Sequence, residues 1–141
     1  MRNPDPEPNG DDPARHPLLR ARWRPLWCTL LLLTIVAVCA LAFDPHPPPA
    51  IDTGWDKRNH LLAFATLALL AELAFWPWRW RRARNLLGLL AFGAFIELVQ
   101  TQIPGRSGEW LDLLADGLGI VVGMLLLALA LALKWGGRRR P

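Results

Sequence analysis

Residues 111–133, LDLLADGLGIVVGMLLLALALAL, decide the fold class, because they form a long apolar run whose two aspartates lie near its start. A helix needs about 20 apolar residues to cross the hydrocarbon core of a bilayer. Soluble helices alternate polar and apolar faces, whereas the run after Asp116 carries no charged side chain. The segment therefore fits lipid as its solvent, where its backbone must be helical to satisfy its hydrogen bonds.

Three further apolar blocks, at residues 26–43, 61–75 and 86–101, precede this run. The second and third blocks are short for a membrane span, so we expect the residues that flank them to lie at the lipid headgroups. Hydrophobic residues make up 52% of the chain and are concentrated in these four blocks. The sequence therefore predicts an all-α membrane protein, a bundle of four transmembrane helices.

Basic residues are unevenly distributed among the segments between the blocks. They cluster before the first block, between the second and third, and after the fourth, at Arg15, Arg20, Arg22, Arg24, Arg79, Arg81, Arg82, Arg84, Lys134, Arg138, Arg139 and Arg140. The other two loops carry only Lys57, Arg58 and Arg106. Cytoplasmic segments hold the excess of Lys and Arg, so both termini are expected in the cytoplasm. The net charge of +4 thus reflects topology and contact with membrane lipids, and nucleic acid is not an expected partner.

The chain divides into a membrane domain and two tails. Residues 1–17 are rich in Pro, Asp and Asn and cannot bury enough apolar surface to fold, so we expect a disordered cytoplasmic tail. Residues 18–135 form the predicted four-helix domain, and residues 136–141 form a basic cytoplasmic tail. A cleaved signal peptide around the first block is an alternative, because an Arg-rich stretch precedes it and Ala-Leu-Ala ends at residue 42.

Polar side chains gather at the predicted outer ends of the last three helices, in pairs three or four residues apart that share a helical face. They are Asp56 and His60, Glu97 and Gln100, and Asp112 and Asp116, with the cations Lys57 and Arg106 at the same level. Gly119 and Gly123 lie on the stripe of Asp116, and small residues let helices approach closely. We therefore expect these faces to meet in an outward-facing polar pocket.

The first interpretation of this pocket is a ligand-binding site made by all eight residues. Ionisable groups at the edge of a membrane are costly, which favours a functional role. Arg106 would bind a phosphate or carboxylate group, while Glu97 and Asp112 would orient a hydroxyl or ammonium group. The expected ligand is a lipid headgroup, a cell-wall precursor or an amphipathic drug, bound without a metal or other cofactor.

Two other interpretations remain open. In a structural network, Lys57 and Arg106 would neutralise the carboxylates and hold the helices together. In a membrane hydrolase or transferase, His60 would be the general base, Asp56 or Asp112 would orient it, and Glu97 would be a second acid or base. A metal variant of that enzyme would use His60, Asp112 and Asp116 as ligands. Separately, Glu72 is expected to pair with the arginines between the second and third helices, including Arg79.

Four short motifs resemble those of the VanZ-like family of bacterial membrane proteins. They are DKRNH at 56–60 with Phe64, ELVQ at 97–100, PGRS at 104–107, and DLLAD at 112–116 with Gly119 and Gly123. The chain departs from the expected pattern at Phe64, where an aromatic hydroxyl is common, and at Asp116, where Asn is common. The additional carboxylate at Asp116 puts in doubt any electrostatic role that the family pattern implies for that position.

The resemblance implies a multi-pass protein of the bacterial cytoplasmic (inner) membrane. The founding member of the family is associated with resistance to glycopeptide antibiotics such as teicoplanin. A cell-wall precursor or a glycopeptide is accordingly an expected ligand, but the resemblance supplies no mechanism and leaves enzymatic activity open. A transporter is a less favoured interpretation, because four short spans would need to form a homo-oligomer to enclose a path.

Overall fold

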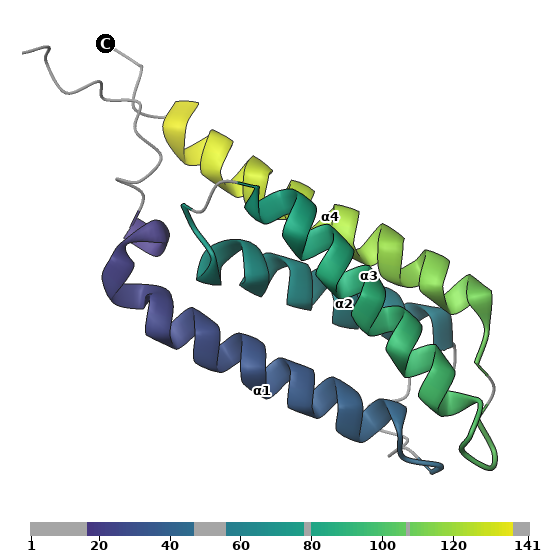
Figure 1. Cartoon of the computed structure of the whole chain (residues 1–141). Coiled ribbons are helices and arrows are strands. Elements are labelled where there is room, and N and C mark those ends of the chain that lie inside the picture. The colour runs from purple at the N-terminus through teal and green to yellow at the C-terminus, as the bar shows by residue number, and fades with distance from the viewer. Residues whose placement is uncertain (1–16, 47–55, 78–79, 107, 137–141) are drawn as a thin grey trace, which may run out of the picture.

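The structure, a computed structural model, describes residues 17–46, 56–77, 80–106 and 108–136, and these ranges contain helices and no strand. Two short 3-10 helices, η2 (Pro17–Leu19) and η3 (Ala21–Trp23), precede the first long helix. The long helices are α1 (Arg24–Ala42), α2 (Asp56–Ala74), α3 (Arg81–Gln100) and α4 (Trp110–Gly136). The predicted all-helical class is confirmed for this part of the chain (Figure 1). The predicted tails fall outside it, apart from residues 17 and 136.

Each long helix coincides with one predicted apolar block to within one residue at the block's C-terminal end or includes it fully, but α2 and α3 begin earlier than their blocks do. α2 begins at Asp56 and α3 at Arg81, because polar residues at a helix end still make main-chain hydrogen bonds while their side chains lie in a polar layer. Prolines lie near both ends of α1. Pro25 lies in the first turn of α1, where its missing N–H costs nothing, and Pro45 follows shortly after the end of α1.

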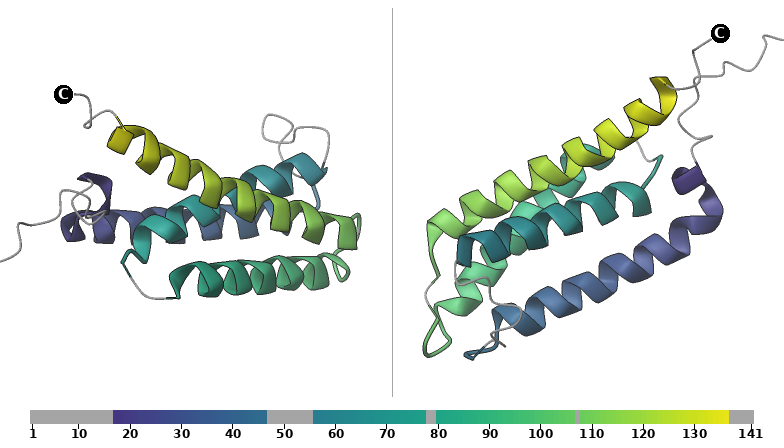
Figure 2. Two further views of the ribbon diagram at one scale, coloured as in Figure 1. Left: turned by 90° about the horizontal axis from the view of Figure 1, so that it is seen from above. Right: turned by 180° about the vertical axis from the view of Figure 1, so that it is seen from behind.

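Three segments among the described residues are long and apolar enough to cross a membrane, by length and composition: Ala21–Ala42, Arg81–Gln100 and Trp110–Leu133. α2 is not one of them. Charged residues occupy its first turn, and Glu72 lies near its other end. α2 is instead the helix that the protein encloses most, since it packs along α4 and also contacts α1 and α3. The right view of Figure 2 shows α2 between α1 and α4.

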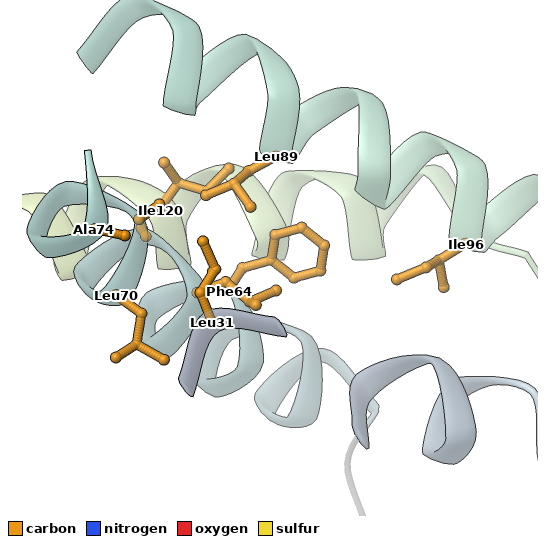
Figure 3. Close-up of a cluster of buried hydrophobic side chains, with 10 residues drawn as sticks. Leu31, Phe64, Leu70, Ala74, Leu89, Ile96 and Ile120 are labelled. Carbon is orange, nitrogen blue, oxygen red and sulfur yellow. The ribbon is translucent and has the colours of Figure 1, made fainter. Parts of the chain in front are cut away.

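The apolar core is built around α2. Phe64, Leu67 and Ala68 of this helix are almost fully buried, and they pack against side chains from the other three helices. Figure 3 shows Leu31 of α1, Leu89 and Ile96 of α3 and Ile120 of α4 converging on this region, with Leu70 and Ala74 farther along α2. By contrast, many leucines on α1 and α4 point outward and are more than half exposed, which suits helices that face lipid.

Two glycines allow α2 and α4 to approach closely. A Cβ atom at Gly119 would collide with the carbonyl oxygen of Leu61, and one at Gly123 with the carbonyl oxygen of Ala65. The helices therefore pack with backbone against backbone, which only a residue without a side chain permits. This confirms that the glycine stripe of α4 faces into the bundle, and it carries Asp116 inward with it.

Candidate functional site

One end of the bundle is polar. It is formed by the start of α2, the end of α3 and the start of α4, with the end of α1 beside them. We use the name polar cluster for Lys57, His60, Glu97, Glu109, Asp112 and Asp116, which are joined by the hydrogen bonds and ion pairs described below. Asp56 begins α2, but its side chain lies outside the described residues.

His60 is at the centre of the polar cluster and is 7% exposed. Its Nδ1 atom lies 2.9 Å from Oδ1 of Asp116, whose side chain is fully buried. When Asp116 is ionised, Nδ1 is the donor, because a carboxylate without a proton can only accept a hydrogen bond, and in the neutral form of the ring Nε2 then carries the lone pair. Nε2 lies 3.7 Å from Oε1 of Glu97.

The residue that orients His60 differs from the prediction. Asp116 holds the ring, whereas the sequence suggested Asp56 or Asp112 for this role. The reason is the rotation of α4 about its axis, because the glycine stripe that contacts α2 also carries Asp116 toward the middle of that helix. Phe64, one turn farther along α2, stacks parallel to the imidazole at a centroid distance of 6.5 Å and closes the site on its apolar side.

Glu97 connects the end of α3 to the start of α4. Its Oε2 accepts a hydrogen bond of 2.6 Å from the backbone N–H of Glu109, which directly precedes α4. A carboxylate is favourable at this position, because the first N–H groups of a helix lack partners and form the positive end of its dipole. The Glu97 side chain is 12% exposed, so it lies at the boundary between the buried residues and the surface.

Lys57 contributes a positive charge to the polar cluster and contacts two of its carboxylates. Its Nζ atom lies 2.8 Å from Oε2 of Glu109 and 3.2 Å from Oδ1 of Asp112, which is 1% exposed. The hydrogen bond from the ammonium group lowers the pKa of the Glu109 carboxyl. The expected neutralising role is therefore present for Lys57. Glu109 was not among the predicted site residues, although it lies just before α4 and three residues before Asp112, a spacing that brings side chains to the same side of a helix.

Arg106 lies elsewhere than predicted. Its Nε and Nη2 atoms donate hydrogen bonds to the carbonyl oxygens of Asp44 at 3.0 Å and Leu41 at 2.7 Å. Gln100 donates in the same way to the carbonyl oxygen of Ala42 at 3.1 Å. The last carbonyl groups of a helix lack partners and attract cations. Arg106 therefore holds the end of α1, which corrects the expectation that it neutralises the carboxylates.

The polar cluster carries more negative than positive charge. Four carboxyl groups, those of Glu97, Glu109, Asp112 and Asp116, face one ammonium group and one imidazole. Several buried oxygen atoms also make no hydrogen bond within the described part of the chain, namely Oε1 of Glu97, Oδ2 of Asp116 and Oε1 of Gln100, while Oδ1 of Asp112 has the Lys57 ammonium 3.2 Å away. Buried acceptors without partners are costly, so the arrangement suits an additional group of positive charge.

Glu72 forms a second polar group at the opposite end of α2. Its Oε1 accepts a hydrogen bond of 2.9 Å from Asn85, and its Oε2 one of 3.1 Å from Arg81. Arg81 also lies over the Trp76 ring, 4.0 Å from its centroid. The predicted pairing of Glu72 with the arginine cluster is confirmed for Arg81, the first residue of α3, while Arg79 lies outside the described residues. Every carboxylate oxygen here has a donor, so this group is structural.

Three residues of the polar cluster have metal-ligand chemistry at short range. His60, Glu97 and Asp112 each offer one ligand atom, and these atoms lie within 4.8 Å of one another. The set differs from the metal variant considered from the sequence, because Glu97 takes the place of Asp116. Asp116 lies on the far side of the imidazole ring from Glu97, at Nδ1.

Comparison with known proteins places the chain in a family. Residues 26–131 match the family model described as VanZ/LLP1. The match begins in α1 and ends near the end of α4, so it includes every residue of the polar cluster. No curated protein and no solved structure matches the chain significantly. Together with the apolar helices, the family match identifies a membrane protein.

Proposed function

Because the chain belongs to the VanZ/LLP1 family, we propose that it is a binding protein of the bacterial cell envelope. Its polar cluster binds the head of an envelope ligand: a lipid headgroup, a cell-wall precursor or a glycopeptide-type compound. The observation that carries this proposal is the excess of carboxylates over cations in the polar cluster, together with buried oxygen atoms such as Oδ2 of Asp116 that have no hydrogen-bond donor among the described residues. A ligand that brings positive charge or hydrogen-bond donors would supply what they lack.

We propose further that α1, α2, α3 and α4 all cross the cytoplasmic membrane, with both termini in the cytoplasm. The distribution of arginines supports this topology under the positive-inside rule. α2 is too polar to be recognised as a span by itself, but its neighbours bury most of its middle part. Polar residues inside a bundle are tolerated when protein, not lipid, surrounds them. The polar cluster would then lie at the outer leaflet.

The experiment is a thermal-stability measurement on the purified chain in non-ionic detergent. Wild type, Glu97→Gln and Glu72→Gln are compared with phosphatidylethanolamine, phosphatidylglycerol, a lipid-linked cell-wall precursor and teicoplanin. A ligand of the polar cluster raises the Tm of wild type and Glu72→Gln, because binding to the folded state alone stabilises it. The rise should shrink in Glu97→Gln. An unchanged Tm with every compound would leave the cluster as a structural network that joins the helices.

A link to antibiotic resistance is tested separately, in cells. The chain and its Glu97→Gln variant are expressed at equal levels in a susceptible host, and growth is measured against teicoplanin. If the polar cluster contributes to resistance, wild type raises the inhibitory concentration and the variant does not. Equal sensitivity of wild type and an empty-vector control would oppose this part of the proposal.

A second candidate function is hydrolysis or group transfer, and the Asp116–His60 hydrogen bond favours it. A buried carboxylate on Nδ1 makes Nε2 a proton acceptor, which is what a general base requires. Glu97 would be the second acid or base, while the side chain of Asp56, the third candidate, lies outside the described residues. The test is to incubate envelope lipids with wild type or with His60→Gln and to analyse them by mass spectrometry. Hydrolysis or group transfer predicts a product that wild type forms and His60→Gln does not.

A further inference from the structure

We propose that the polar cluster holds a divalent transition-metal ion, of the zinc class, through His60, Glu97 and Asp112. This inference rests on the proposed function, because the ion would be the positive charge through which the cluster contacts its ligand. It departs from the expectation, drawn from the sequence, that the site works without a metal. The three ligand atoms come from α2, α3 and α4, so the ion would also join these helices.

The distances suit a metal site that closes slightly on binding. The ligand atoms lie within 4.8 Å of one another, and in a tetrahedral zinc site with bonds near 2.1 Å they would be about 3.4 Å apart. Glu97 has a long side chain at the boundary of the site, so rotation about its bonds can shorten these distances. His60 and Asp112 are 7% and 1% exposed. In such water-poor surroundings the attraction between a metal cation and a carboxylate is stronger than in water.

The histidine is already oriented as a metal ligand. A metal-binding His usually donates its other ring N–H to a carboxylate, which sets the tautomer and increases the basicity of the binding nitrogen. Asp116 accepts that hydrogen bond from Nδ1 at 2.9 Å, and Nε2 faces Glu97. Asp116 is not one of the three proposed ligands, so the carboxylate that orients the ring is separate from the two that would bind the ion.

The charges and the remaining contacts agree with a cation of charge +2. Asp112 is almost fully buried, and Oδ1 has the Lys57 ammonium 3.2 Å away. Lys57 also contacts Glu109 at 2.8 Å and would keep that partner if Asp112 turned to a metal. One imidazole with two carboxylates favours Zn²⁺ or Mn²⁺ over Mg²⁺ and Ca²⁺, which prefer oxygen ligands alone.

The metal would determine which part of the envelope ligand is recognised. Three protein ligands leave a fourth position of a zinc ion open to water or to an oxygen of another molecule. That oxygen would be anionic, as in the phosphate of a lipid headgroup or of a lipid-linked precursor, or in a carboxylate. The substrate class that follows is a phosphate- or carboxylate-bearing amphiphile, whereas bare carboxylates would select an ammonium group.

The test uses the full chain without an affinity tag, in non-ionic detergent, titrated calorimetrically with Zn²⁺ alone. We expect one ion per chain. Glu97→Gln and Asp112→Asn should weaken the Kd by more than about tenfold, and Asp116→Asn, which only positions His60, by roughly 10- to 100-fold. Glu72→Gln, the same chemical change at the opposite end of α2, should bind as wild type does. Visible absorption of bound Co²⁺ on the wild type reports a nitrogen- and oxygen-ligated site without any variant.

The outcomes separate the metal from the proposed function. No binding of Zn²⁺, or binding that is equal in all variants, overturns the metal site. If a lipid still stabilises wild type in the presence of EDTA, the proposed function stands without the metal. If Zn²⁺ binds with the expected variant pattern but no envelope compound stabilises the loaded protein, the metal site stands and the proposed ligand binding fails.

Discussion

The Oδ2 atom of Asp116 on α4 occupies the space that a side chain at Gly93 on α3 would need, because a Cβ atom at residue 93 would collide with it. The missing side chain lets the carboxylate lie between α3 and α2. There its other oxygen reaches Nδ1 of His60 at 2.9 Å. A glycine on one helix thus sets the orientation of a histidine on another.

Gly93→Ala should displace Asp116 and destabilise the bundle. An added methyl group in a packed site costs about 1–3 kcal/mol, because either the carboxylate must turn away from His60 or α3 and α4 must separate. Thermal unfolding in detergent measures the change. Gly88→Ala is the matched control on the same helix, since a Cβ atom at residue 88 has no atom within 4 Å. Equal effects of the two variants would contradict the assigned packing.

Gly123→Ala should separate α2 from α4. The new methyl group would meet the main-chain carbonyl of Ala65, which cannot rotate away as a side chain does, so a loss of about 1–3 kcal/mol in unfolding free energy is expected. Gly117→Ala on the same helix is the comparison, because its Cβ atom would lie 3.7 Å from a side-chain atom of Leu90, an ordinary contact. That variant should unfold at the wild-type temperature or slightly above it.

Arg106→Gln should loosen the end of α1. In this variant the carbonyl groups of Leu41 and Asp44 lose their hydrogen bonds from Arg106. A hydrogen bond from a charged donor contributes about 1.5–3 kcal/mol to folding stability, which sets the upper limit of the loss for each bond. Hydrogen–deuterium exchange should increase in the last turn of α1 and stay unchanged in the middle of α4. If exchange increased around His60 instead, Arg106 would belong to the polar cluster after all.

The proposed topology predicts which loops a membrane-impermeant maleimide reaches. In a background with Cys28→Ser and Cys39→Ala, Gln102→Cys should be labelled on intact cells, because residue 102 follows α3 at the end proposed to face outward. Arg82→Cys, at the other end of α3, should be labelled only after permeabilisation. Both positions are exposed, so access to the thiol depends on the side of the membrane. The opposite pattern would reverse the orientation, and labelling of both on intact cells would contradict the spans.

The helices could be predicted from the sequence more fully than the contacts between them. Local apolar composition is enough to require a helix in lipid, and each predicted block lies within or beside one helix. Hydropathy did not reveal that α2 and α3 begin at Asp56 and Arg81, because polar residues extend a helix without adding to its apolar run. Nor did it reveal that α2, the one long helix that is not apolar enough to be a span by composition, lies at the centre of the core of the described residues.

In the polar cluster too, the sequence predicted which residues lie together better than it predicted which side chains contact each other. The spacing along each helix correctly brought His60, Glu97, Asp112 and Asp116 to one end of the bundle. It did not separate the roles of the two aspartates, which share a face of α4. It also grouped Arg106 with these residues, although this arginine binds the carbonyl groups of Leu41 and Asp44 at the end of α1.

By itself, then, the sequence determined the helical class, the apolar segments and the set of polar residues at one end, because these depend on composition and on spacing within single helices. Only the tertiary structure decided that Asp116 orients His60, that Lys57 joins Glu109 to Asp112, and that Gly93 makes room for the buried carboxylate. These contacts depend on the rotation of each helix about its axis and on the path of the connections between helices. Both are set by packing between residues far apart in the chain.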